Sequence, residues 1–303
     1  MNAVPDKFPN RNEYLGCSEV AAAAGLNPWQ TPLDLFLQKT GQVPRPDLSQ
    51  KDAVLFGELL EDVVANEFAR RSGLEVRRDS REFAHPKLPF LRGHIDRRIV
   101  GRRAGLECKT AGIRMASEFG DSGTDEVPPH YLVQCAAYMA VTGFDEWHLA
   151  VLIAGNDFRT YRIPRDEELV AAVEARARAF WDAVQTGQPP AAVTAADVRA
   201  LYKQDEGTEV VATAEIAEAC ASLAAAKAQI KAAETLEEAL ATQVQSFMGL
   251  HATLLGPDGR PLATWKTIRS SRLDGKRLEA EHPELAAQYR AESVSRRFTL
   301  KLK

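Results

Sequence analysis

The sequence contains no stretch that would place it in a membrane or mark it for export. No run of about 18 consecutive apolar residues occurs, so we expect no membrane span. The chain begins Met-Asn-Ala-Val-Pro-Asp-Lys-Phe, which is not the basic-then-apolar order of a secretory signal. These two absences favour a cytoplasmic location.

Cysteine is also scarce, and its few positions are scattered along the chain. Cys17, Cys108, Cys135 and Cys220 include no C-x-x-C pair. This spacing argues against a disulfide framework, a zinc ribbon and a cysteine-ligated iron–sulfur cluster. It fits the reducing conditions of a cytoplasm.

The chain carries little net charge, although one segment is basic. The formal net charge is −4 over 303 residues, which argues against a protein that coats nucleic acid through bulk charge. From Leu262 to Lys303, however, ten lysines and arginines stand against five acidic residues. The hydrophobic fraction of 45% and the charged fraction of 26% indicate a soluble globular protein of one large or two ordinary domains.

Two short predicted strands carry the most distinctive polar residues. They cover residues 93–98 and 106–110, and residues 101–105 form a turn-rich link with glycine at both ends. Because side chains alternate between the faces of a strand, Glu107 and Lys109 share one face.

Asp96 on the first of these strands adds a second carboxylate. Ile95 and Ile99 are the expected buried set of this strand and leave Asp96 on the opposite face. If the polar faces meet, the carboxylates of Asp96 and Glu107 converge with the ammonium of Lys109. Two close carboxylates repel each other, and Mg²⁺, which prefers carboxylate, water and phosphate oxygens, relieves that repulsion. Lys109 would then orient or deprotonate a water beside a phosphodiester.

A Glu-x-Lys pattern is also typical of a solvated strand with a weak salt bridge, so it needs support from other segments. An amphipathic helix is predicted over residues 52–71. Its expected apolar side consists of Leu55, Leu59, Val63 and Phe68. Gly57 and Glu61 share another helix face, where the glycine leaves room for a close approach. Glu61 is a site candidate, with an ordinary surface charge as the alternative.

A second helix is predicted over residues 130–141, after two prolines that are tolerated at a helix start. Its residues Tyr131, Gln134 and Tyr138 are spaced by three and four and lie on one side. Near the N-terminus, Ser18 suits the cap of a helix, whose free N–H groups favour an anion such as a terminal phosphate. That Ser18 only caps the helix is the alternative.

A glycine–proline break at residues 186–190 is the strongest candidate domain boundary. It divides the chain into residues 1–190 and 191–303. In the second part, residues 213–250 are predicted to form a long helix that packs against another helix. Its heptad positions include Ile216, Leu223, Ile230 and Val244. A turn at 256–259, a strand at 262–268 and the basic tail follow.

Together these residues resemble the YqaJ-type viral recombinases, in the lambda-exonuclease-like branch of the PD-(D/E)XK nucleases. The residues that carry the resemblance are, in chain order, Arg11, Ser18, Gly57, Glu61, Asp96, Glu107, Cys108, Lys109 and Gln134. The resemblance implies an α/β fold. Residues 1–190 would form a PD-(D/E)XK restriction-endonuclease-like core with a mixed sheet flanked by helices, followed by a C-terminal long helix and a small β and basic extension.

The resemblance also implies roles at a metal site. Asp96 and Glu107 would ligate Mg²⁺, or Mn²⁺ in its place, with the backbone carbonyl of Cys108 as a further ligand. Lys109 would assist the attacking water. Glu61 would sit at the edge of the metal site and act through water.

Further residues would position the substrate. Gln134 would orient the backbone or the water, and Arg11 and Ser18 would hold a 5′-phosphate. Arg114 would supply a second phosphate contact.

The activity that the resemblance implies is a 5′-to-3′ exonuclease on double-stranded DNA ends in phage or prophage recombination, within a bacterial host cell. Such an enzyme would pass its single strand to an annealing protein, and family members can form trimeric rings. An endonuclease of the same fold is one alternative. A catalytically silent DNA-binding or assembly module is another.

Overall fold

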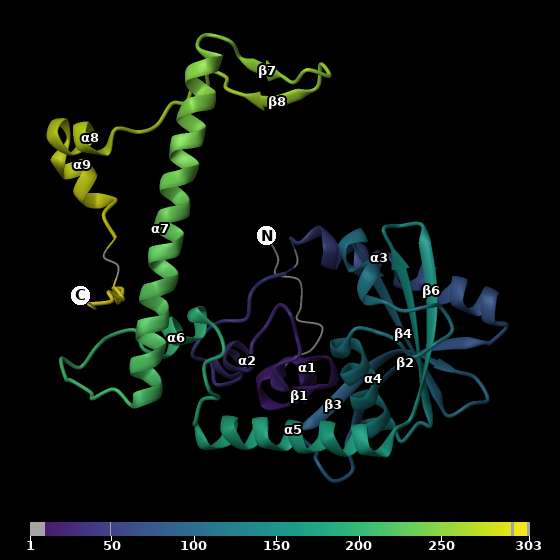
Figure 1. Cartoon of the computed structure of the whole chain (residues 1–303). Coiled ribbons are helices and arrows are strands. Elements are labelled where there is room, and N and C mark those ends of the chain that lie inside the picture. Colours follow the sequence, from purple (N-terminus) through teal and green to yellow (C-terminus); the bar gives the residue numbers. More distant parts are fainter. Residues whose placement is uncertain (1–9, 49, 292–293, 302–303) are drawn as a thin grey trace. The chain divides into compact units, whose positions relative to one another are not determined.

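The computed structural model describes residues 10–48, 50–291 and 294–301, and the chain divides into two units, Met1–Leu201 and Tyr202–Lys303 (Figure 1). The division lies after α6 (Ala195–Leu201), later than the boundary predicted at residues 190 and 191. Asp197 explains the difference, because its buried carboxylate accepts a hydrogen bond from Thr31 Oγ1 at 2.9 Å and ties α6 to the first unit.

A six-stranded mixed sheet forms the centre of the first unit. Its strands are β1 (Leu15–Gly16), β2 (Val76–Ala84), β3 (Leu91–Ile99), β4 (Ala104–Ala111), β5 (Glu146–Ile153) and β6 (Asp157–Pro164). The order is β1-β3-β4-β5-β6, and β2 also pairs with β3. β1 is parallel to β3 and β4 to β5, whereas the other pairs are antiparallel.

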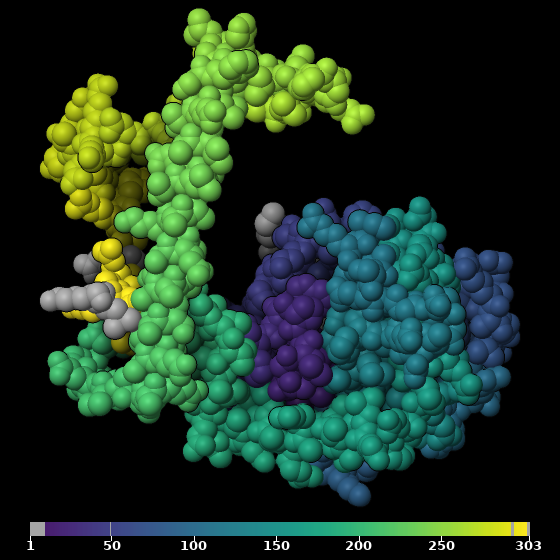
Figure 2. Space-filling view, in the orientation of Figure 1, coloured from purple at the N-terminus to yellow at the C-terminus, as the bar shows by residue number. Residues whose placement is uncertain are grey.

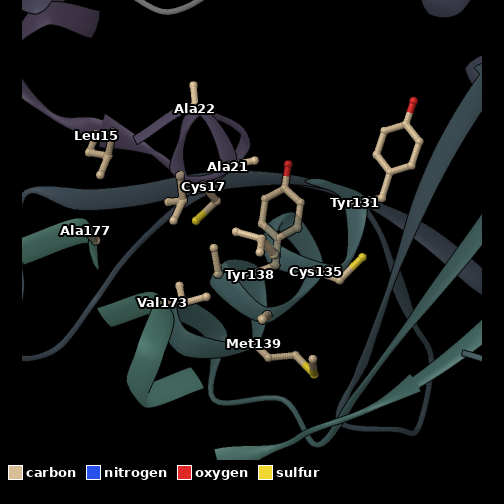
Figure 3. Close-up of a cluster of buried hydrophobic side chains, with 14 of the residues drawn as sticks. Leu15, Cys17, Ala21, Ala22, Tyr131, Cys135, Tyr138, Met139, Val173 and Ala177 are labelled. Atoms are coloured by element: carbon tan, nitrogen blue, oxygen red, sulfur yellow. The ribbon is translucent and has the colours of Figure 1, made fainter. Parts of the chain in front are cut away.

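Helices cover both faces of this sheet (Figure 1). They are α1 (Val20–Ala23), α2 (Pro32–Lys39), α3 (Asp52–Ser72), α4 (Pro129–Thr142) and α5 (Glu167–Thr186). The main core joins α1, α2, α4 and α5 to one face, and Figure 3 shows Tyr138 of α4 and Val173 of α5 within it. Phe68 of α3 packs with Leu106 on the other face. A mixed sheet flanked by helices, as predicted, is confirmed.

The helix predicted over residues 52–71 is confirmed as α3, but its predicted apolar side is wrong apart from Phe68. Leu55, Leu59 and Val63 are 46%, 62% and 54% exposed. The buried residues are Val64, Ala65 and Phe68. Only the C-terminal half of α3 packs on the sheet, and the residues that face the sheet there lie on a stripe rotated from the predicted one.

A glycine in β4 sets the distance between the sheet and α4. A Cβ on Gly105 would lie 2.3 Å from the ring of Trp147, so a larger residue would displace this tryptophan. Tyr138 of α4 stacks on the same tryptophan ring, with the ring centroids 5.0 Å apart. α4 therefore lies close over β4, which brings Gln134 near Glu107.

The second unit contains the predicted long helix, α7 (Ala214–Met248), and a small hairpin of β7 (Thr253–Leu255) and β8 (Pro261–Thr264), followed by α8 (Gly275–Glu281) and α9 (Pro283–Gln288). The hairpin extends from the end of α7 in the space-filling view (Figure 2).

The heptad positions of α7 remain on the surface of this unit. Leu223 is 37% exposed and Ile230 58%, so packing of α7 against another helix stays a prediction. The predicted basic tail ends at Lys303, which, like Glu292, lies outside the described residues. Among the described residues, no helix is both long and apolar enough to cross a membrane.

Candidate active site

The candidate site lies where β3 and β4 separate. These strands pair only at Arg97 with Leu106 and at Arg98 with Gly105. Asp96 and Glu107 are the next residues on the two strands. Across the gap, the Cys108 backbone N–H donates a hydrogen bond of 2.8 Å to Asp96 Oδ2. The divergence of the strands thus places two carboxylates together.

Glu107 is buried, with 3% of its surface exposed. Its Oε1 lies 2.5 Å from Lys109 Nζ and accepts a hydrogen bond of 2.7 Å from Gln134 Nε2. Gln134 also donates to the Tyr138 hydroxyl at 3.1 Å, so the predicted polar side of this helix faces the site. Glu107 Oε2 is buried without a hydrogen-bond partner among the described residues. Such an unsatisfied oxygen is costly unless a ligand or water binds it.

The two carboxylates raise each other's energy in the absence of a cation. Burial and the nearby Glu107 raise the pKa of Asp96 to about 8. Burial alone would lower the pKa of Lys109, but Glu107 and Asp96 outweigh it and raise that pKa above its usual range. An excess of buried negative charge with one unsatisfied carboxylate oxygen fits a hard divalent cation. No cluster of three or more acidic, histidine or cysteine ligands is found within the described part of the chain.

Glu61 lies at the edge of this site, where it forms an ion pair with an arginine side chain. Glu61 Oε1 accepts a hydrogen bond of 2.6 Å from Arg97 Nη1. The same nitrogen donates to the Asp96 backbone oxygen at 2.6 Å, and Arg97 also pairs with Asp62. Sequence reasoning missed Arg97. The available signal was a charged residue at a core-facing position, between Ile95 and Ile99 on an alternating strand.

Arg11 and Ser18 lie together, as predicted, on two short 3₁₀ turns, η1 (Arg11–Glu13) and η2 (Cys17–Glu19). Arg11 Nη2 donates a hydrogen bond of 3.1 Å to Ser18 Oγ. A Cβ on Gly93 would lie 2.7 Å from Cys17 Sγ, so glycine at this position of β3 permits the close approach of η2. This approach brings the arginine and serine into the same cavity as Asp96.

The predicted capping role of Ser18 is wrong. Ser18 lies inside η2, and the carboxylate of Glu19 instead accepts the hydrogen bond from Gly16 N at 2.8 Å. The following helix, α1, has only four residues.

One open cavity of about 560 Å³ contains most of the predicted site. Its lining includes Arg11, Ser18, Glu61, Asp96, Glu107, Lys109 and Gln134, together with Tyr14, Glu58, Arg78, Asp79, Arg92, His94, Arg97 and Tyr138. Arg114, by contrast, lies exposed on η3 (Ile113–Glu118) and does not line this cavity.

A second buried carboxylate, Glu19, lies behind the Arg11 end of the cavity, and sequence reasoning missed its role. Lys39 Nζ is 2.7 Å from Glu19 Oε2, and Arg11 and Arg45 pair with Oε1. Burial raises the pKa of Glu19, but these three cations outweigh it and lower the pKa below its usual value. The partners come from distant segments, so no local pattern marks them.

Fold and site together define a mixed α/β core with an acid on one strand and Glu-x-Lys on the next, beneath a helix that carries glutamine. The chain belongs to the YqaJ-like viral recombinase family, as the resemblance in its sequence indicates. The family's domain model matches residues 8–145. YqaJ of Bacillus subtilis (strain 168) is 36% identical over 299 residues, which cover 96% of this chain and 92% of that protein.

Solved structures also resemble part of the chain. An alkaline exonuclease, LHK-Exo, from Laribacter hongkongensis is 17% identical, with a TM-score of 0.48 over 59% of this chain and 91% of that chain. A phage related exonuclease from Haemophilus somnus 129PT is 15% identical, with a TM-score of 0.45 over 57% and 94% of the two chains.

Proposed function

We propose that this protein is a metal-dependent deoxyribonuclease that digests double-stranded DNA from its ends in the 5′-to-3′ direction. The observation that carries the proposal is the meeting of Asp96 and Glu107 beside the ammonium of Lys109 in an open cavity. Membership in a viral recombinase family supports a role in phage or prophage recombination.

Mg²⁺ is the proposed cofactor, with Mn²⁺ as a substitute. Asp96, Glu107 and the backbone carbonyl of Cys108 would hold the ion, and Glu61 would contact it through water. The unsatisfied oxygen of Glu107 supports this assignment. When bound, the ion supplies positive charge that polarises a phosphoryl oxygen and acidifies water.

Lys109 acts on the attacking water. In the metal-free protein, Glu107 and Asp96 raise the pKa of Lys109 and favour its ammonium form. Beside the bound ion, Lys109 would orient or deprotonate the attacking water. The ring of Tyr131, with its centroid 5.5 Å from Lys109 Nζ, helps hold this ammonium. Gln134 fixes the orientation of the Glu107 carboxylate.

Arg11 and Ser18 favour a DNA end over an internal phosphodiester. A guanidinium offers paired donors to a terminal phosphate, and the serine hydroxyl beside it adds one more. Both residues share a cavity with the paired carboxylates, which supports a 5′-phosphate held near the reacting bond.

Digestion of linear and closed circular duplex with Mg²⁺ tests the proposal. We expect the linear duplex to lose nucleotides from its 5′ ends while the circle stays intact. Cutting of the circle would indicate an endonuclease, and no digestion of any DNA would indicate a silent binding module. The expected annealing-protein partner and trimeric ring are tested by pull-down and by mass in solution.

A further inference from the structure

The second unit carries an exposed basic segment that the proposed catalytic site does not use. Residues 266–272, Lys-Thr-Ile-Arg-Ser-Ser-Arg, have no helix or strand and connect β8 to α8. We name this segment the basic coil. It contains three cations, three hydroxyl side chains and no acid, and all of its residues are exposed.

None of the cations of the basic coil has an acidic partner among the described residues. Lys266, Arg269 and Arg272 form no ion pair within the part of the chain that the structure describes. Around the coil, Arg260 pairs with Asp258, Arg277 with Glu281 and Arg290 with Glu279, whereas Lys276, Arg296 and Arg297 form no ion pair within the described residues. Asp274, the acid closest in sequence, accepts a hydrogen bond from the Arg277 backbone N–H as the cap of α8.

The side chains of this segment match the chemistry of a nucleic-acid strand. Lysine, arginine, serine and threonine are the side chains that most often contact phosphate oxygens. Trp265, which precedes the coil, is 48% exposed and offers a ring on which a base can stack. The coil presents cations and hydroxyls without an accompanying carboxylate, so it suits a uniformly anionic ligand better than the mixed charges of a protein surface.

We propose that the basic coil binds the phosphodiester backbone of DNA, as a contact separate from the catalytic cavity. This contact goes beyond the proposed nuclease function and does not depend on cleavage. It would hold DNA while the cavity acts on an end.

The salt dependence of DNA binding tests this contact directly. The full-length variant Lys266→Gln/Arg269→Gln/Arg272→Gln is compared with wild type by fluorescence anisotropy, in EDTA and over a series of salt concentrations. Each lost phosphate contact lowers the slope of log affinity against log salt by about 0.9 on duplex DNA and about 0.7 on single strands. We therefore expect the slope to fall by about 3 on duplex or about 2 on a single strand, and the two DNA forms show which strand form the coil contacts.

A matched control removes three other exposed cations. Lys87→Gln/Arg176→Gln/Arg178→Gln changes the net charge equally in the first unit, outside the cavity lining. We expect this variant to keep the wild-type slope. An equal fall of the slope in both variants would show that only the net charge matters, and it would overturn the proposal.

Unchanged slopes on both DNA forms would also overturn it and leave a protein as the ligand of the basic coil. Because EDTA prevents metal-dependent cleavage, the result is independent of the nuclease proposal. If wild type cuts no DNA but the triple variant still has the lower salt-dependence slope, only the nuclease proposal is refuted.

Discussion

Glu19 and Glu107 are both buried carboxylates in the first unit, but their charges are balanced differently. Lys39, Arg11 and Arg45 surround Glu19, and each of its oxygens has a cationic partner. Glu107 has one ammonium, faces a second carboxylate and keeps one oxygen without a partner among the described residues.

The difference separates a structural charge from one prepared for a ligand. A buried ion pair with complete hydrogen bonding holds segments together, and removing one partner is expensive. Two buried carboxylates with too few cations keep an unfavourable arrangement that a bound cation can relieve. The opposite pKa shifts, down for Glu19 and up for Asp96, express the same contrast.

Asp96→Asn is the most direct test of the contrast between the balanced Glu19 and the paired carboxylates at Glu107. Loss of one of the paired charges should lower the cleavage rate by at least about 10³-fold, since a bound metal contributes several kcal/mol to the transition state. The same change should raise the Tm of the metal-free protein. An amide removes the repulsion with Glu107, and its oxygen still accepts from the Cys108 backbone N–H. Nuclease assays and thermal unfolding in EDTA measure the two effects.

Metal binding provides the control for this variant. Mn²⁺ should raise the Tm of wild type but not of Asp96→Asn, because a ligand that binds only the folded state stabilises it. If Asp96→Asn still cleaves DNA, or if Mn²⁺ raises its Tm as much as that of wild type, Asp96 is not a metal ligand.

Lys109→Ala should produce the next largest effect. We expect kcat to fall about 10²-fold, the usual cost of losing one preorganised group that stabilises transition-state charge. DNA affinity measured in EDTA should change much less, because the ammonium contacts Glu107 in the site and not an extended phosphate surface. Equal losses in turnover and binding would contradict a role at the attacking water.

The sequence patterns predicted the site around Glu107 because its arrangement depends on local geometry. Alternation on two adjacent strands placed Glu107 and Lys109 on one face and Asp96 away from the buried Ile95. Ile99, predicted on the same face as Ile95, packs instead in the core on the α3 side. Helical spacing placed Gln134 on the side that faces them. These periods describe the backbone itself, so they hold wherever the elements pack.

The ion-pair cluster around Glu19 could not be predicted, because it depends on which distant segments meet. Glu19 is 20 residues from Lys39, and nothing in their spacing brings them together. The same reason explains the error on α3, where the sheet selects Val64 and not Leu59 for burial. It also explains why the partner of Glu61 was missed, since Arg97 comes from another element.

Glu19→Gln tests the structural side of the comparison. It leaves the buried Lys39 without its counter-charge, and breaking such a pair costs about 3 kcal/mol of unfolding free energy. Denaturant unfolding measures this loss. The exposed pair of Glu67 with Arg70 provides the control, and Glu67→Gln should leave the stability nearly unchanged.

The loss in Glu19→Gln should also depend on pH. The folded-state pKa of Glu19 lies below its usual value of 4.5, so its contribution is complete above that value and disappears as the pH falls through the lowered pKa. Wild type and variant should therefore converge in stability in acid. A constant difference at all pH values would show that the carboxylate charge is not responsible.

Arg11→Ala should have the smallest effect. Arg11 links the Glu19 cluster to the cavity that contains Glu107. Arg11 pairs with Glu19 and also lines the cavity beside Ser18. Loss of one charged hydrogen-bonding group should slow digestion of 5′-phosphorylated ends about tenfold and leave 5′-hydroxyl ends almost unchanged. Arg45→Ala is the matched control, because Arg45 pairs with the same carboxylate but does not line the cavity. If both variants slow both kinds of end equally, the Glu19 cluster only supports the fold. If Arg11→Ala alone discriminates between them, the balanced cluster positions a residue that reads the DNA end.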